Sequence, residues 1–301
     1  MSTPSSRRHA DGRPAHAGPG GGTVTDLESL VWGFGLLEGP RVDADDRLFF
    51  ADVPNGGVFC RTPDGTLHTV VPKRRGVGGI ALHADGGIVI GGRDVSHVHD
   101  GASRVLYRFD APGINDLMAD PVGRVVVGTL RTDPFAAGGT RSAGEAWRID
   151  AESVATELYG GVLLSNGIGF SPDGGMLYHA DTASNGVWAH DYGADGSVRG
   201  RRLAVHADDL EPDGLAVDED GTLWIADVSG ARAVRAFRPD GTEVARIPVP
   251  ARMVTSLCFG GADRRDLYIV TADNTDHPER AGTVFRTRVD VPGLPAPLVR
   301  I

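Results

Sequence analysis

Lysine is nearly absent from this sequence, and the balance of charge excludes one large class of partners. Lys73 is the only lysine among 30 basic residues, which are outnumbered by 40 acidic residues to give a formal net charge of −10. Binding to the phosphates of nucleic acid requires a basic surface. We therefore expect no nucleic-acid partner.

Cysteine is also scarce, and several common catalytic motifs are missing. Cys60 and Cys258 have the spacing of neither a zinc site nor a redox motif, so we interpret them as buried thiols, with a disulfide as the open alternative. The chain contains no His-Glu-x-x-His motif and no Gly-x-Ser-x-Gly motif. Histidines such as His179 are therefore interpreted as packing or surface residues, and Ser165 has no base that the sequence can assign to it.

Long apolar runs are absent as well. No stretch approaches the roughly 20 apolar residues that a membrane-spanning helix needs, and the start of the chain has no secretory apolar segment. Residues 1–22 are rich in Ser, Arg, His, Pro and Gly, so we predict a disordered lead-in followed by a single domain over residues 23–301. We expect a cytoplasmic protein, monomeric or a small homo-oligomer, without a membrane partner.

What the sequence does contain is a repeated pair of apolar runs joined by a tight turn. The turn residues Asp46, Gly86, Gly123, Gly174 and Gly221 are 40, 37, 51 and 47 residues apart, and a sixth, looser unit spans residues 255–270. A repeat of this length, built from short strands, is typical of four-stranded propeller blades. We predict an all-β fold, a six-bladed β-propeller with a central channel. Residues 23–34 are predicted to supply a strand that closes the ring by joining the last blade.

Four oxygen-bearing residues occupy the same place in the repeat. Glu38, Asn115, Asn166 and Asp213 each stand at the start of a first strand, and in a propeller these starts meet at one rim of the channel. Two carboxylates and two carboxamides form a set of hard oxygen ligands, which suits calcium or a similar divalent ion. The alternative is that these residues, three of them directly beside a glycine, only serve turns.

A second register of aspartates ends the second strands. Its members are expected to hydrogen-bond backbone amides in the turn that follows, and two of them could instead orient a metal ligand. The register consists of Asp52, Asp181, Asp227 and Asp273.

These motifs resemble the regucalcin/gluconolactonase family of six-bladed propeller lactonases. The resemblance covers roughly residues 28–290, in the family's order. It is carried by the segments Leu37-Glu38-Gly39-Pro40, Asn115-Asp116, Gly128-Thr129, Ser165-Asn166-Gly167, Pro212-Asp213-Gly214 and 255–261.

The resemblance implies a metal-dependent hydrolase that opens a small lactone. Glu38, Asn166 and Asp213 would hold one divalent ion, calcium first and zinc, magnesium or manganese as alternatives. Asn115 would contact the metal, its water or the substrate, and either Asp213 or the metal ion would activate the attacking water. The alternatives are a phosphotriesterase-like or specialised-metabolism enzyme with the same cage, and a calcium-binding propeller without catalysis.

One departure from the family pattern concerns substrate binding. Relatives that act on sugar lactones tend to carry an arginine two residues before the Asn-Asp pair, where this chain has Gly113. Arg93 and Arg131 follow second strands at the same rim and are the candidates to replace it. The stretch from Leu130 to Ala143 is long for a loop inside a compact domain, and we predict that it covers part of the site.

Overall fold

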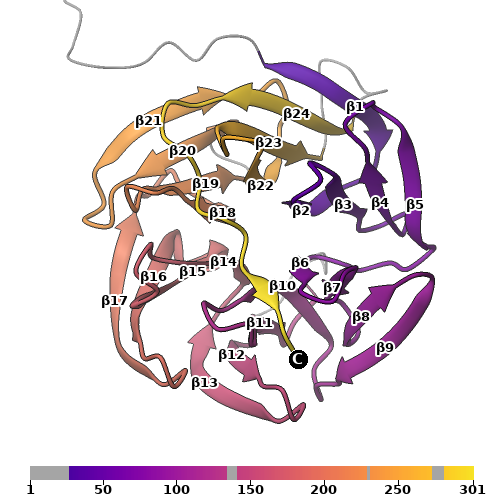
Figure 1. Cartoon of the computed structure of the whole chain (residues 1–301). Helices are drawn as coiled ribbons and strands as arrows, with labels where there is room; N and C mark the ends of the chain where they lie inside the picture. The colour runs from indigo at the N-terminus through magenta and orange to yellow at the C-terminus, as the bar shows by residue number, and fades with distance from the viewer. Residues whose placement is uncertain (1–26, 134–140, 229–230, 273–280) are drawn as a thin grey trace, which may run out of the picture.

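The computed structural model describes residues 27–133, 141–228, 231–272 and 281–301. Six sheets, each with four antiparallel strands, surround a central axis, which confirms the predicted six-bladed propeller (Figure 1). The predicted lead-in of residues 1–22 lies outside the described residues. Within those residues no helix has the length and the apolar character that crossing a membrane requires.

Each blade runs from an innermost strand at the axis to an outermost strand at the perimeter. Blade one contains β2 (Leu37–Val42), β3 (Leu48–Asp52), β4 (Gly57–Arg61) and β5 (Leu67–Pro72), and blade two contains β6 (Ile80–His83), β7 (Ile88–Ile90), β8 (Val95–His99) and β9 (Ala102–Tyr107). Blade three contains β10 (Gly113–Ala119), β11 (Val125–Leu130), β12 (Gly144–Ile149) and β13 (Ala155–Val162). Blade four contains β14 (Ser165–Phe170), β15 (Met176–Asp181), β16 (Gly186–Tyr192) and β17 (Val198–His206), with the 3-10 turn η1 (Thr182–Ser184) after β15. Blade five contains β18 (Pro212–Val217), β19 (Leu223–Asp227), β20 (Ala233–Phe237) and β21 (Glu243–Pro248). Blade six contains β22 (Val254–Gly260), β23 (Asp266–Thr271), β24 (Gly282–Arg288) and β1 (Glu28–Phe34), and β25 (Leu298–Val299) lies beside β6.

The core lies between neighbouring blades. Strands such as β3 and β19 are buried along their whole length because a neighbouring blade covers each face, so they read as continuous apolar runs. Leu37 and Phe50 of blade one, for example, pack with Val270 and Val284 of blade six. No blade buries its apolar faces alone, and the ring is therefore the unit of stability.

Both cysteines are buried, free thiols, as the interpretation of the sequence expected. They lie in different packing clusters, Cys60 between blades one and two and Cys258 between blades six and one. The open alternative of a disulfide between them is thereby removed.

The ring is closed by a strand from the opposite end of the chain. β1 pairs antiparallel with β24, with Glu28 opposite Arg286 and Phe34 opposite Gly282. This pairing confirms the closing strand predicted from residues 23–34. It also covers the edge of β24, which would otherwise present unpaired backbone groups to solvent.

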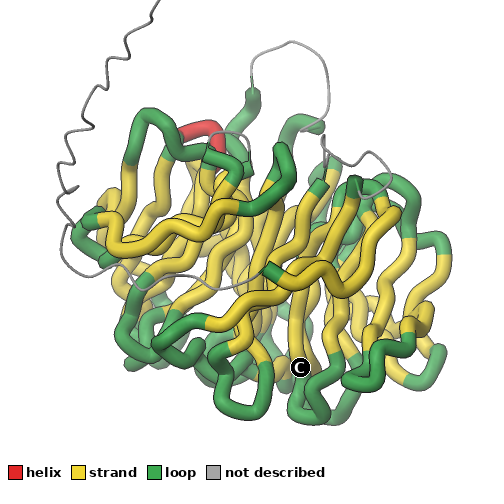
Figure 2. The backbone as a smooth tube through the Cα atoms, turned by 90° about the horizontal axis from the view of Figure 1, so that it is seen from above, coloured by secondary structure: helices red, strands yellow, loops and turns green. Residues whose placement is uncertain are grey.

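The last residues of the chain add a strand that the sequence did not reveal. β25 pairs in parallel with β6, the innermost strand of blade two, and the segment that leads to it crosses the centre of the ring (Figure 1). Val299 is fully buried, and the Arg300 amide donates to the Gly123 carbonyl at 2.8 Å. From the side, the C-terminus lies at the lower edge of the ring and η1 at the upper edge (Figure 2).

Candidate active site

A cavity of about 910 Å³ opens at the end of the channel where the innermost strands begin. Glu38 from β2, Asn115 from β10, Asn166 from β14 and Asp213 from β18 all line it. The structure therefore brings together, from four blades, the four oxygen-bearing residues that the repeat singled out. Thr182 of η1 also lines the cavity.

These four residues lie within strands, at irregularities of strand pairing. The register between innermost and second strand shifts between Glu38 and Arg41, between Ile114 and Leu117, between Ser165 and Ile168, and between Pro212 and Leu215. Such bulges turn side chains away from the regular alternation. The repeated polar residue beside a glycine thus belongs to a bulge in the strand, and the alternative of turn residues does not hold.

Glycines in the innermost strands or just before them allow neighbouring blades to approach one another closely. A Cβ atom on Gly167 would lie 2.4 Å from the Leu215 backbone nitrogen, and one on Gly78 would lie 2.5 Å from Asn115 Oδ1. Both distances are shorter than non-bonded contacts allow. Glycine at these positions lets neighbouring blades bring their polar residues to one point.

A relay of hydrogen bonds fixes the orientation of the two amides. Asn115 Nδ2 donates to the Ser165 carbonyl at 2.8 Å and to Asn166 Oδ1 at 2.7 Å. Asn166 Nδ2 donates to Thr182 Oγ1 at 2.8 Å, and that hydroxyl donates to the Pro212 carbonyl at 2.7 Å. Both amide hydrogens of Asn115 are therefore committed to protein. Thr182 was not among the predicted site residues, because only its position after Asp181 connects it to the repeat.

The carboxylates at the cavity floor are buried close to one another. Burial and the neighbouring charges of Asp213 and Asp116 raise the pKa of Glu38 well above its ordinary value. Burial and the charge of Asp116 likewise raise the pKa of Asp213. Asp213 Oδ1 is buried without a hydrogen-bond partner among the described residues. Such a cluster of negative charge is unfavourable unless protons or a cation neutralise it.

The nearest cation of the protein compensates this cluster only weakly. Arg41 Nη2 lies 3.9 Å from Asp116 Oδ1, and the guanidinium donates instead to the carbonyls of Pro40 at 2.7 Å and Leu117 at 3.4 Å. Glu38 and Asp213 receive no guanidinium in hydrogen-bond contact among the described residues. The floor of the cavity is thus electrostatically suited to an added cation.

The donor set of the floor fits a cation that prefers oxygen. Two buried carboxylates and the oriented Asn166 carbonyl oxygen supply hard ligands, and the unpartnered Asp213 Oδ1 is the kind of atom that a bound cation would satisfy. Within the described ranges, no three His, Cys, Asp or Glu side chains form a metal-binding group. The proposed set has only two such residues, because its third member is an amide.

The aspartates that end the second strands secure the entry to the innermost strands. Asp52 Oδ2 accepts from the Gly35 amide at 3.0 Å, Asp181 Oδ1 from the Leu164 amide at 2.9 Å, and Asp227 Oδ1 from the Glu211 amide at 3.4 Å. These amides lie in the residues just before Glu38, Asn166 and Asp213. The predicted bond from an amide of the following turn is confirmed for Asp52, whose Oδ1 accepts from the Asn55 amide at 3.3 Å. The three bonds above instead go to residues that precede the innermost strands. Asp273 lies outside the described residues.

Arg93 and Arg131, the candidates for the role of the arginine that is absent at Gly113, have different positions. Arg93 lines the cavity. Arg131 is not among the lining residues, and its Nε donates to Glu145 Oε1 at 3.0 Å. Leu130, Asp133 and Arg141, from the two ends of the long loop, line the cavity, whereas residues 134–140 lie outside the described residues.

A serine and a histidine are paired close to the site but closed off from it. Ser165 Oγ hydrogen-bonds to His179 Nε2 at 2.8 Å, and the Tyr159 hydroxyl hydrogen-bonds to Nδ1 at 2.8 Å. Ser165 and His179 are fully buried and do not line the cavity. Burial lowers the pKa of His179 to about 3, so the ring is neutral. We interpret this pair as structural support for the strand that carries Asn166.

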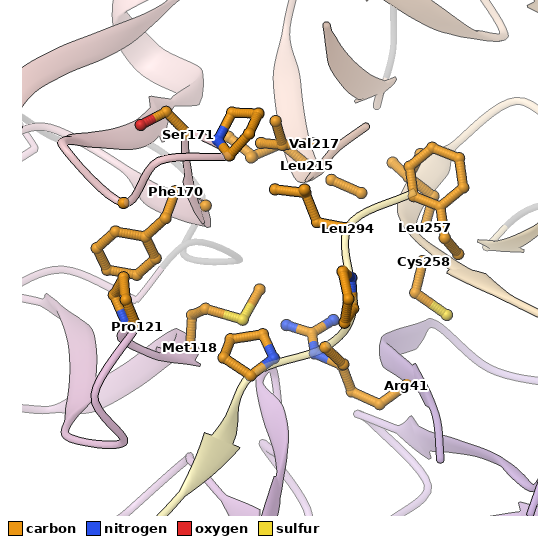
Figure 3. Close-up of a pocket in the computed structure, with 18 of the residues that line it drawn as sticks. Arg41, Met118, Pro121, Phe170, Ser171, Leu215, Val217, Leu257, Cys258 and Leu294 are labelled. Atoms are coloured by element: carbon orange, nitrogen blue, oxygen red, sulfur yellow. The ribbon is translucent and has the colours of Figure 1, made fainter. Parts of the chain in front are cut away.

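The opposite end of the channel is chemically different. A smaller cavity of about 290 Å³ is lined there by apolar side chains such as Met118, Phe170 and Leu215, with Leu294 of the C-terminal segment forming one wall (Figure 3). Arg41 contributes its guanidinium to this cavity. None of the four oxygen-bearing residues lines it. The candidate active site is therefore confined to the end of the channel where the innermost strands begin.

Fold and site together define a propeller protein with an acidic centre inside one channel mouth. Residues 36–273 match the family described as the SMP-30/Gluconolactonase/LRE-like region, and the chain belongs to this family.

Two curated relatives and one solved structure illustrate the similarity. The chain is 32% identical to the pentonolactonase XacC of Haloferax volcanii, over 86% of this chain and 93% of the relative. It is 34% identical to the 6-deoxy-6-sulfogluconolactonase of Pseudomonas putida, over 83% of this chain and 90% of the relative. The crystal structure of the calcium-binding protein regucalcin from Agrobacterium tumefaciens superposes with a TM-score of 0.79 and 23% identity, over 91% of this chain and 97% of that one. This last similarity concerns the fold.

Proposed function

We propose that this chain is a lactone-hydrolysing enzyme that depends on a divalent cation held by Glu38, Asn166 and Asp213. The observation that carries the proposal is the pair of buried carboxyl groups at the cavity floor, one of which has an oxygen without a partner among the described residues. Two relatives that match most of the chain are named lactonases. Calcium is the first candidate, because the ligands are all oxygens and a protein of the same fold is described as calcium-binding.

The proposed reaction needs only water and the lactone. When bound, a divalent cation would polarise the lactone carbonyl and stabilise the negative charge that develops on its oxygen. The water oxygen forms a bond to the carbonyl carbon, the bond between that carbon and the ring oxygen breaks, and the ring oxygen leaves as a hydroxyl. Asp213 is the candidate to take the proton of the water and return it to the ring oxygen.

The remaining residues would set the geometry of the floor. Asn115 holds the carbonyl oxygen of Asn166 in place through its own amide hydrogens, which leaves its Oδ1 as the atom for contact with substrate or water. Arg93 is proposed to contact the substrate from the cavity wall. The cavity volume of about 910 Å³ is sufficient for a sugar-sized lactone.

The proposal is tested by measuring hydrolysis of aldonolactones and aromatic lactones with a pH indicator. Turnover should disappear in chelator and return when calcium, magnesium, manganese or zinc is added singly. Asp213→Asn, which keeps the shape of the side chain, should lower kcat by at least about 100-fold, since it removes both a ligand charge and the proton acceptor. Asp240→Asn, an exposed turn position away from the cavity, is the matched control.

Three outcomes separate the alternatives. Metal-dependent turnover that is missing only in Asp213→Asn supports the lactonase. Calcium binding by calorimetry without turnover of any lactone contradicts it and favours a calcium-binding propeller. Turnover that persists in chelator would refute the dependence on a cation.

A further inference from the structure

Arginine is concentrated at the mouth of the candidate active site. Five of the 24 residues that line the cavity are arginines, whereas lysine and arginine together make up 30 of the 301 residues of the chain. They come from five different loops, those between β5 and β6, β7 and β8, β11 and β12, β19 and β20, and β21 and β22. These residues, named here the arginine rim, are Arg75, Arg93, Arg141, Arg232 and Arg252.

The arginine rim reverses the charge of the molecule around it. The chain carries a formal net charge of −10, so a group of cations at one opening is not a consequence of overall composition. Asp133 and Glu211 are the acidic residues of the wall, while Glu38 and Asp213 lie at the floor. With a divalent cation at the floor, the cavity as a whole would carry positive charge. Such a mouth attracts anions and raises their rate of association.

Most of the rim arginines are not committed to ion pairs in the described part of the chain. Arg75, Arg141 and Arg232 are exposed and form no ion pair with another described residue. The side chain of Arg93 is 78% exposed, and its Nε lies 3.6 Å from Asp94 Oδ2. Asp94 already forms a closer ion pair with Arg74, whose Nη2 lies 2.7 Å from Asp94 Oδ1. By contrast, Arg131, outside the cavity, is held by Glu145 at 3.0 Å. Arg75, Arg141 and Arg232 therefore offer exposed guanidinium groups that a ligand can reach and bind.

The cavity wall beside Asn115, near the floor, has open space where a side chain could stand. A Cβ atom on Gly113 would meet only Leu130 Cδ1, at 3.9 Å, so the wall next to Asn115 is open. The guanidinium groups that line this site lie in the loops around the opening, and the wall beside Asn115 contributes no arginine to the lining. A substrate that uses them must reach from the floor to the mouth.

We propose that the substrate is an anionic lactone, whose ring binds at the floor while a phosphate, sulfonate or carboxylate group, distant from the reacting carbonyl, binds at the arginine rim. This inference rests on the proposed lactonase function and names the substrate class of the same site. Guanidinium groups bind such oxyanions with paired, charge-assisted hydrogen bonds. A neutral sugar lactone would leave them unused.

The test compares lactones that differ only at C6. Values of kcat/KM are measured for gluconolactone and for its 6-phosphate and 6-deoxy-6-sulfonate analogues, in buffer with about 20 mM and with about 500 mM NaCl. The higher salt concentration shortens the Debye length and screens the attraction between exposed charges. We expect at least about a 10-fold preference for an anionic analogue, which decreases several-fold at the higher salt concentration. The analogue with the higher kcat/KM identifies whether phosphate or sulfonate is the better ligand.

Arginine variants locate the effect. Arg75→Gln combined with Arg232→Gln should lower kcat/KM for the anionic lactones by about 10-fold or more and leave that for gluconolactone within about twofold. Arg199→Gln, at an exposed position of the outer strand β17, is the matched control. Equal efficiency on neutral and anionic lactones at both salt concentrations would overturn the anionic substrate while leaving the lactonase intact.

A binding measurement that needs no turnover separates a failure of the lactonase proposal from a failure of the anion-binding arginine rim. If no lactone is hydrolysed with any metal ion, the proposed function fails, and calorimetry then compares gluconate with 6-phosphogluconate on the wild-type protein. Tighter binding of 6-phosphogluconate that is lost in the Arg75 and Arg232 double variant would still support an anion-binding rim. Equal binding of the two acids would contradict it.

Discussion

At the scale of single residues, the site depends on the direction in which Asn166 points. Its side-chain oxygen can serve as a ligand only if its nitrogen is held elsewhere, and the structure provides that through Thr182 Oγ1. The threonine hydroxyl is anchored in turn by the Pro212 carbonyl, next to Asp213. One hydroxyl therefore connects the orientation of an amide in blade four to the backbone that carries a carboxylate in blade five.

Replacing this hydroxyl should weaken the binding of the cation. Thr182→Val keeps the shape of the side chain but removes the bonds to Asn166 and Pro212, so we expect a loss of about 10- to 100-fold in calcium affinity, measured by calorimetry. Thr182→Ser retains the hydroxyl and should stay within a few-fold of wild type. A valine variant with unchanged affinity would show that the orientation of Asn166 does not depend on Thr182.

At the scale of the strands, the innermost strand β14 combines a bulge with a close approach to its neighbour β18. Gly167 illustrates this, because the atoms that a side chain would meet belong to the backbone of β18 and cannot move independently. Gly113 is the opposite case, since the space beside it is open. The same residue type thus has a strict steric role at one strand position and none at another.

Gly167→Ala should consequently destabilise the protein, whereas Gly113→Ala should not. The added methyl group at position 167 would lie 2.4 Å from the Leu215 nitrogen, and relieving that overlap requires β14 and β18 to separate. We expect a loss of about 2–4 kcal/mol in the free energy of unfolding for Gly167→Ala and less than about 0.5 kcal/mol for Gly113→Ala, from denaturant titration. Similar stability of both variants would refute the close approach of these strands.

Strand positions and the four oxygen-bearing residues were predictable from the sequence, whereas their supporting contacts were not. The repeat placed Glu38 and Asp213 at one rim because strand order and turn spacing are local properties. The bulges were missed because a one-residue irregularity leaves the apolar pattern nearly intact. β25 was missed because two paired residues directly after Pro295 and Pro297 give no strand signal. The ion pair of Arg131 was missed because its partner, Glu145, lies on the other side of a long loop, and a linear pattern does not reveal such a contact.

At the scale of the whole molecule, stability depends on closing the ring. β1 is the only element of the described chain that pairs with the outer edge of β24, and it comes from the other end of the sequence. Its removal would expose the β24 edge and the faces of Leu30, Val31 and Phe34 that pack against the core between blades six and one. Open sheet edges of this kind favour association between molecules.

A shortened chain that begins at Leu36 should show the cost of opening the ring. We expect its melting temperature to fall by at least about 10 °C and a fraction of it to associate, as measured by calorimetry and size-exclusion chromatography. The control is a chain that begins at Leu27, which retains β1 and should melt within about 2 °C of the full-length protein. Equal melting of the two shortened chains would contradict a role of β1 in closure.

The pairing of β25 with β6 also bears on when the protein can fold. β6 belongs to the second blade, yet its neighbour on the axis is made of the last residues, and contacts such as that between His83 and Ile301 join positions 218 residues apart. During synthesis, blade two emerges long before the residues of β25 that complete it, and β1 must wait for β24. Folding therefore cannot be completed blade by blade as the chain emerges, because the first two blades and the closing strand depend on segments that are made late.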